Sequence, residues 1–209
     1  MRTHQTSLTG RRVLITGAAR GIGAALAERL HERGARVALA GLEPDLLAQA
    51  AAKAGAPWWH CDVADRASVE AAVDAAVGEL GGLDVVVANA GIAAQLPLVG
   101  GDPEVFEQIN RVNVLGAYYT LRAAGPHISH PNGYAVAVSS LGAAVSVPLM
   151  GAYSASKAAV EALGNTLRAE LAPSGARVGV AYFAELDTDM TSRGFGTEAA
   201  KSIFGDGTV

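Results

Sequence analysis

Short apolar runs alternate with longer segments rich in Ala, Leu and Glu along most of the chain. The near-continuous apolar character of these runs is typical of strands in a parallel sheet covered on both faces. We predict six such strands, at residues 12–16, 36–40, 56–61, 83–89, 134–140 and 177–183. The intervening segments have helical character, and several end at a glycine, as helices often do. We predict helices at residues 21–34, 43–55, 65–81, 102–128 and 150–172.

This alternation of strands and helices predicts an α/β fold. The expected architecture is a doubly wound, Rossmann-like parallel sheet in three α/β/α layers, with right-handed crossovers and strand order 3-2-1-4-5-6. We expect residues 1–209 to form a single domain. Only the nineteen residues 191–209 follow Met190. They can hold one short helix at 197–204, so we expect a shortened C-terminal part, either a short tail or a truncated lid over the substrate.

Composition and charge argue against several other classes of protein. Hydrophobic residues make up 50% of the 209 residues and charged residues 17%, which excludes a disordered chain. A net charge of −4 argues against a nucleic-acid-binding protein, because such proteins need a basic face. The single cysteine and the five histidines show no metal-binding spacing, so we expect no metal site. We see neither a membrane-spanning run nor an apolar leader, and expect a cytoplasmic protein with no membrane partner.

The first predicted strand runs directly into the glycine-rich segment GAARGIG at 17–23. Gly17, Gly21 and Gly23 therefore stand between a strand and a helix, where a phosphate group can meet the first amides of the helix. Glycine also permits a tight turn and the close approach of a ligand to the backbone. The spacing G-x-x-x-G-x-G differs from the G-x-G-x-x-G dinucleotide fingerprint. A plain tight turn is the alternative interpretation.

Tyr153 and Lys157 lie one helical turn apart in the segment YSASK. A free phenol has a pKa of about 10, so only about 0.1% is ionised at pH 7, and a neighbouring ammonium group favours the phenolate. The pair is either an acid–base centre or two solvated neighbours. Tyr118 and Tyr119 have no lysine one turn away, and we interpret them as core or helix-interface residues.

Together these motifs resemble the short-chain dehydrogenase/reductase family. The resemblance is carried by TGAARGIG (16–23), ANAG (88–91), NVLG (113–116), SS (139–140) and YSASK (153–157), in the family's order and at its usual intervals. It implies an NAD(P)-dependent oxidoreductase that interconverts a carbonyl and a secondary alcohol by hydride transfer. It further implies a homodimer or homotetramer built through the helical segments 102–128 and 150–172.

The resemblance also assigns roles to individual residues. It makes Tyr153 the general acid/base and Lys157 the residue that lowers its pKa and holds the nicotinamide ribose. It places Ser140 at the substrate oxygen, and Asn113 in a water-linked proton relay to Lys157. The implied cofactor-binding residues are Gly17, Arg20, Gly21, Ile22, Gly23, Leu42, Asp62, Val63, Asn89, Ala90, Gly91, Tyr153, Lys157 and Thr188.

The choice between NAD and NADP depends on the residues after the second strand. Gly41 stands where NAD-dependent relatives carry an acid, and Leu42 where many NADP-dependent relatives carry an arginine. Arg20 is placed either to meet a 2′-phosphate or to be a solvated loop residue. We interpret Glu43 as the cap of the next helix. These features slightly favour NADP. Asp62 would lie at the adenine edge, or would cap a helix, a role that Asp65 can equally take.

Two departures from the family pattern leave other functions open. Phe183 and Ala184 replace the usual Pro-Gly pair, and Ala88 replaces the first Asn of the family's N-N-A-G motif. With the short C-terminal part, the loss of Pro-Gly is compatible with a non-catalytic sensor or scaffold that binds a nicotinamide nucleotide. A methyltransferase would use a glycine loop of this kind for S-adenosylmethionine, but it has no use for the tyrosine–lysine pair.

Overall fold

Six parallel strands form one sheet in the computed structural model, which describes residues 7–184. The strand order is β3-β2-β1-β4-β5-β6, as predicted. Thr188, the segment 191–209 and the predicted helix at 197–204 lie outside the described residues. The strands are β1 (Arg12–Thr16), β2 (Arg36–Gly41), β3 (Trp58–His60), β4 (Val85–Ala88), β5 (Tyr134–Ser140) and β6 (Arg177–Phe183).

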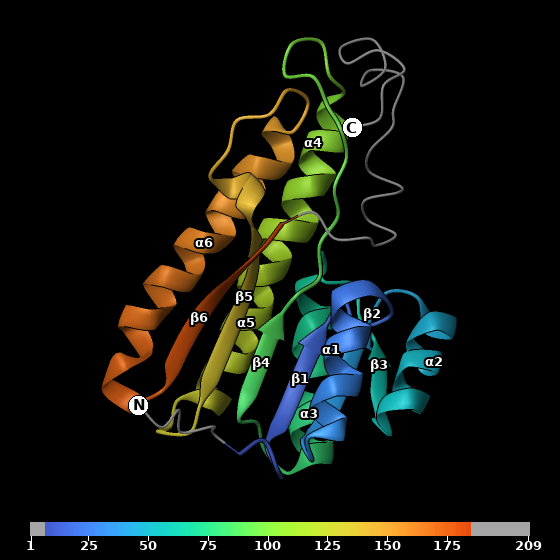
Figure 1. Cartoon of the computed structure of the whole chain (residues 1–209), viewed down its shortest axis with the longest axis vertical. Coiled ribbons are helices and arrows are strands. Elements are labelled where there is room, and N and C mark those ends of the chain that lie inside the picture. The colour runs from blue at the N-terminus through green and yellow to red at the C-terminus, as the bar shows by residue number, and fades with distance from the viewer. Residues whose placement is uncertain (1–6, 185–209) are drawn as a thin grey trace.

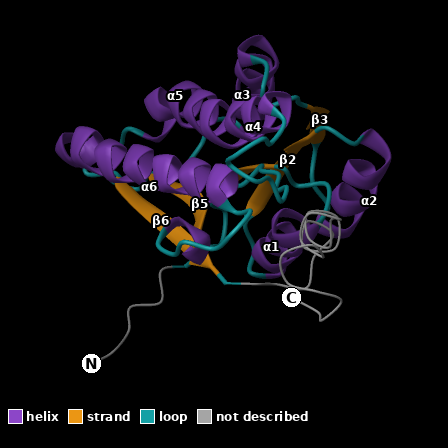
Figure 2. Ribbon diagram, turned by 90° about the horizontal axis from the view of Figure 1, so that it is seen from above, coloured by secondary structure: helices purple, strands orange, loops and turns teal. Residues whose placement is uncertain are grey.

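Helices cover both faces of this sheet (Figures 1 and 2). Val13 and Ile15 of β1 pack with α1 and α2 on one face, whereas Leu14 packs with α3, α5 and α6 on the other. This alternation follows from the two-residue period of a strand, which turns successive side chains to opposite faces. The helices are α1 (Gly21–Glu32), α2 (Pro44–Ala54), α3 (Arg66–Leu80), α4 (Pro103–Asn110), α5 (Gly116–Ile128) and α6 (Gly151–Leu171).

Two helices begin directly after an aspartate whose side chain caps the first turn. The carboxylate of Asp65 caps α3 by accepting from the Ala67 amide, and Asp102 caps α4 by accepting from the Glu104 amide. Pro44 occupies the first turn of α2, as its fixed φ favours. Glu43 stands at the cap position of α2, but its side chain makes no capping hydrogen bond. Its predicted capping role is therefore wrong.

Three other local predictions need correction. The strand predicted at 56–61 is only Trp58–His60, because β3 is an edge strand whose Trp58 stays 38% exposed. The helix predicted at 102–128 is divided by a π-helical turn at Arg111–Leu115. The strand predicted at 83–89 is only Val85–Ala88. Tyr119 is partly buried against the core, and Tyr118 is 44% exposed, which is compatible with its predicted place at a helix interface.

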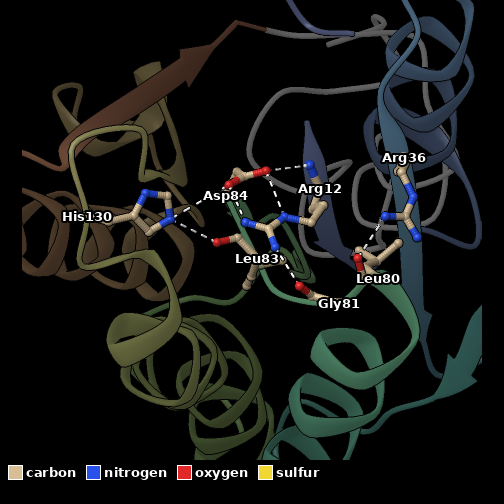
Figure 3. A network of polar contacts seen from close by, with 7 residues as sticks. All are labelled: Arg12, Arg36, Leu80, Gly81, Leu83, Asp84 and His130. Carbon is tan, nitrogen blue, oxygen red and sulfur yellow. Dashed lines mark hydrogen bonds and ion pairs between the residues drawn. The ribbon is translucent and has the colours of Figure 1, made fainter. Parts of the chain in front are cut away.

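An ion-pair network joins β1 to the start of β4 (Figure 3). Oδ2 of Asp84 accepts from the backbone N and the Nε of Arg12 at 2.9 and 3.0 Å, and Oδ1 accepts from Nη2 at 2.7 Å. Nε2 of His130 lies 3.1 Å from the Leu83 carbonyl oxygen and 3.7 Å from Oδ1 of Asp84. The hydrogen bonds from Arg12 lower the pKa of Asp84 to about 2, against the opposing effect of burial.

No helix in residues 7–184 is long and apolar enough to cross a membrane. Over the same residues, no group of three or more His, Cys, Asp or Glu side chains is arranged to hold a metal ion. The single cysteine, Cys61, is buried, and burial raises the pKa of its thiol to about 11. Cys61 is therefore a core residue with little thiolate character near neutral pH.

We expect Asp84→Asn to lower the free energy of unfolding at pH 7 by about 1–2 kcal/mol, because it removes the charged acceptor of Arg12. The folded-state pKa of Asp84 lies below that of the unfolded chain. The stabilisation is therefore complete above about pH 4 and is lost as the pH falls toward 2. Urea unfolding of both proteins between pH 2 and 7 should show the difference narrowing below about pH 4 and falling toward zero as the pH approaches 2. Asp74→Asn, at an exposed position of α3, is the control. Equal stability of Asp84→Asn and the parent chain at pH 7 would contradict the role of this ion pair.

Candidate active site

β1, β4 and β5 are parallel neighbours, so their carboxyl ends lie together at one end of the sheet. Helix α6 packs against β5. Ligands of doubly wound sheets bind at this end, where the order of strands reverses, here between β1 and β4. The predicted residues Gly17, Asn89, Ser140 and Tyr153 all come to this end, although the chain separates the first from the last by more than half its length.

The glycine loop is held by the loop that follows β4. The side-chain amide of Asn89 donates to the backbone oxygens of Thr16 and Gly17 at 3.0 and 3.1 Å, and its backbone N–H donates to the Thr16 hydroxyl at 3.2 Å. Gly17 has φ of +64°, and a Cβ there would lie 2.6 Å from the Cα of Ala90. A Cβ at Gly23 would lie 2.5 Å from the Gly17 oxygen. Only glycine fits these two positions.

This loop has the properties of a phosphate cradle. Helix α1 begins directly after it, and no side chain caps the helix. The first backbone N–H groups of α1, at Gly21, Ile22 and Gly23, have no intrahelical acceptor, and the helix dipole favours an anion there. Asp65 and Asp102 fill the equivalent positions of α3 and α4 with a carboxylate. The loop therefore fits the pyrophosphate of a dinucleotide.

Asn113 is buried in the π-helical turn and joins two elements of the site. Its Oδ1 accepts from the Ile92 N–H at 2.8 Å, and its Nδ2 donates to the Ile92 oxygen and to the Ser156 hydroxyl, each at 2.9 Å. The Ser156 hydroxyl donates in turn to the Tyr153 carbonyl oxygen at 2.7 Å. Our sequence analysis did not assign Ser156 a role, although the YSASK motif that carried the resemblance contains it.

Lys157 is the most deeply buried charged group of the site, at 3% exposure. Its Nζ donates to the Val138 carbonyl oxygen at 3.0 Å and lies 5.8 Å from the centre of the Tyr153 ring. A Cβ at Gly91 would lie 3.2 Å from both Lys157 Nζ and Asn113 Oδ1, so the absence of a side chain at Gly91 leaves room for both groups. Burial lowers the pKa of Lys157 to about 8.

Ser140 and Tyr153 form the second half of the candidate centre. The Ser140 hydroxyl accepts from the Gly142 N–H at 3.0 Å and lies 3.4 Å from the Phe183 carbonyl oxygen. Burial raises the pKa of Tyr153, and a hydrogen bond with Ser140 opposes that rise. The ammonium of Lys157 donates to the Val138 oxygen, so burial and the Ser140 hydrogen bond set the pKa of Tyr153 in this structure. Desolvation without a paired charge disfavours the phenolate.

The adenosine side of the site differs from the sequence-based expectation. Arg20, at the start of α1, forms an ion pair with Glu43, at the start of α2. The case for NADP treated Arg20 as a cation available to a 2′-phosphate, and this pairing weakens it. Leu42, which directly precedes Glu43 in the sequence, is 57% exposed.

The residues after β3 make hydrogen bonds and packing contacts within the fold. Oδ1 of Asp62 accepts from the Ala64 N–H at 2.9 Å, and Asp65 caps the helix that follows. Val63 is buried and packs against α5, where a Cβ at Gly116 would lie 2.8 Å from its Cγ2. At the end of β6, the side chain of Phe183 packs partly against the core in place of the family's proline, and the next residue, Ala184, is exposed.

The fold and the site define a dinucleotide-binding α/β protein with a buried lysine one helical turn from a tyrosine. The sequence profile of the family described as short chain dehydrogenase matches residues 11–207. The chain therefore belongs to the short-chain dehydrogenase family, and is an oxidoreductase of the class that uses NAD(P) and acts on alcohol or carbonyl groups.

Two curated enzymes are similar in sequence. The chain is 36% identical over 177 residues to D-threitol dehydrogenase of Mycolicibacterium smegmatis, covering 82% of this chain and 68% of that enzyme. It is 36% identical over 172 residues to L-2,3-butanediol dehydrogenase of Corynebacterium glutamicum, covering 78% of this chain and 66% of that enzyme. The chain thus spans about two thirds of the length of these relatives.

Two solved structures are similar in fold. The 3-ketoacyl-(acyl-carrier-protein) reductase of Brucella melitensis, complexed with NADH, matches with a TM-score of 0.85 and 32% identity, over 89% of this chain and 80% of that chain. An NAD⁺-bound xylitol dehydrogenase matches with a TM-score of 0.80 and 32% identity, over 85% of this chain and 71% of that chain.

We expect Lys157→Met to raise the free energy of unfolding at pH 7 by about 1–2 kcal/mol, because it removes a buried charge and keeps a side chain of similar length. The pKa of Lys157 is lower in the folded chain than in the unfolded one. The cost of burying the charge is therefore full below about pH 8 and declines as the pH rises toward about 10.4.

Chemical denaturation of the parent chain and of Lys157→Met at pH 7 and pH 10 measures this effect. The stability difference should shrink at the higher pH. Lys53→Met, at an exposed position in the last turn of α2, serves as the control and should show no such trend. If Lys157→Met were less stable than the parent chain at both pH values, the lysine would be a net stabilising group and this account would be wrong.

Proposed function

We propose that the chain interconverts a carbonyl and a secondary alcohol by hydride transfer, with Tyr153 as the general acid/base. The observation that carries this proposal is the convergence of Asn113, Ser140, Tyr153 and Lys157 beside an uncapped helix that begins with a glycine loop. The family resemblance of the sequence assigns these four residues to one catalytic centre, which supports the proposal.

Each side chain has a step that it can perform. A nicotinamide cofactor supplies or accepts the hydride when bound. During reduction, the Tyr153 hydroxyl donates its proton to the carbonyl oxygen of the substrate, and during oxidation it takes the proton back. The Ser140 hydroxyl hydrogen-bonds the same oxygen and stabilises the charge that develops there. The raised pKa of Tyr153 keeps the phenol protonated at neutral pH, which suits its role as proton donor during reduction. For oxidation the phenolate is needed, and Lys157 would favour it by lowering this pKa beside the bound cofactor.

Lys157 and Asn113 assist the proton transfer by Tyr153. The ammonium of Lys157 would hold the nicotinamide ribose by donating hydrogen bonds to its hydroxyl oxygens. Nζ already donates to the Val138 carbonyl oxygen. Asn113 fixes the π-helical turn through its bonds to Ile92 and Ser156 and would position the water chain that relays a proton to Lys157. We expect Gly17, Gly21, Ile22 and Gly23 to hold the pyrophosphate and Arg20 to lie at the adenosine ribose. The remaining contacts of the cofactor are expected from Leu42, Asp62, Val63, Asn89, Ala90, Gly91 and Thr188.

A non-catalytic sensor or scaffold remains the alternative to this proposal. Binding of NADH or NADPH without turnover across a broad panel of ketones and secondary alcohols would support that alternative. A cytoplasmic location stays a prediction from the sequence, and cell fractionation would check it.

We expect Tyr153→Phe to lower turnover by about 10²–10⁴-fold, because the phenyl ring keeps the packing and removes the only transferable proton of that side chain. Absorbance of the reduced nicotinamide gives the rate with each cofactor, and fluorescence titration gives its dissociation constant, which should change little. Tyr118→Phe removes a hydroxyl from an exposed tyrosine of α5 and is the matched control. Full turnover by Tyr153→Phe with a confirmed substrate would show that another group transfers the proton.

We also propose that the chain assembles as a homodimer or homotetramer through the helices of residues 102–128 and 150–172. Three large apolar side chains along α4, the π-helical turn and α5 are 39–44% exposed: Phe106, Leu115 and Tyr118. Exposed apolar groups of this size favour an interface. Sedimentation equilibrium should show an oligomer that Phe106→Asp weakens. A monomer at all micromolar concentrations would contradict the proposal.

A further inference from the structure

Glu43 is a carboxylate that the proposed chemistry does not use, and it faces the adenosine end of the site. β1 and β2 pair in register from Arg12 and Arg36 to Thr16 and Ala40, so the segments that follow them run side by side. A hydrogen bond of 3.1 Å from the Ala18 N–H to the Ala40 oxygen continues this contact into the glycine loop. Across this junction the guanidinium of Arg20 and the carboxylate of Glu43 form their ion pair.

Position 41 carries no acid in this chain, although NAD-dependent relatives carry one there. A Cβ at Gly41 would lie 3.4 Å from Leu47 Cδ1 and 3.6 Å from both the Cβ and the backbone N of Ala19. Glu43, two residues later, reaches the glycine loop with a longer side chain, and is 38% exposed in its ion pair. It makes no capping bond to its own helix, which leaves its charge directed to Arg20.

We propose that Glu43 makes this chain selective for NAD over NADP. The inference rests on the proposed function, because it requires that a nicotinamide dinucleotide occupies the site. A 2′-phosphate beside the pair would place about two negative charges next to a carboxylate that already neutralises Arg20. The ribose hydroxyls of NAD carry no charge, and the same carboxylate can accept hydrogen bonds from them. The pair thus disfavours the phosphate and tolerates the diol.

Dissociation constants of NADH and NADPH, measured by fluorescence titration without substrate, test the proposal. The parent chain should bind NADH at least about tenfold more tightly than NADPH. Glu43→Gln removes the charge, keeps the shape and leaves the positive charge of Arg20 without this carboxylate. It should shift the ratio of the two dissociation constants toward NADPH by about tenfold or more, and added salt should reduce that gain. Arg20→Gln in the Glu43→Gln background should abolish the gain.

Glu70 provides a matched control, because its carboxylate pairs with Arg122 on α3 and α5 at similar exposure and far along the chain from the glycine loop. Glu70→Gln should leave both dissociation constants within about twofold. If both dinucleotides bind but Glu43→Gln leaves their ratio unchanged, or if the parent chain prefers NADPH, this inference is overturned and the proposed function stands. If neither dinucleotide binds to the folded parent chain, the proposed function fails and the inference fails with it.

Discussion

The pairing of β1 with β4 is the constraint on which the site depends. It brings the glycine loop after β1 beside the loop after β4, although the two strands are about seventy residues apart in the chain. Polar groups hold the pair at both ends: Asp84 with Arg12 at the amino end, and Asn89 with Thr16 and Gly17 at the carboxyl end. The reversal of strand order at this pair opens the edge where a dinucleotide binds.

Lys157 of α6 is a buried charged group whose burial lowers the stability of the fold. Burying the ammonium of Lys157 costs free energy, and its lowered pKa measures that cost. The surroundings keep it in place through the Val138 oxygen, the space left by Gly91 and the fixed amide of Asn113. A buried lysine with a perturbed pKa is characteristic of functional sites.

Much of the fold could be predicted from hydropathy alone, because four of the six strands lie within one residue of their predicted bounds. The exceptions depend on tertiary contacts. The segment 56–61 is apolar enough for a central strand, but sheet order places β3 at an edge, where only three residues pair. The helix predicted at 102–128 has helical periodicity throughout, and only the hydrogen bonds of Asn113 to Ile92 show why a π-helical turn interrupts it.

The class of fold, the glycine loop and the tyrosine–lysine pair could be predicted from the amino-acid sequence. Each of them depends on the pattern of residues within short segments of the chain. Tertiary structure alone decided which charges meet. Arg20 pairs with Glu43, and Asn113 bonds Ser156, only because strand order and register place their elements side by side. It also decided that Lys157 is buried at hydrogen-bond distance from a strand carbonyl, and burial together with those partners, rather than residue type, sets the protonation of a side chain.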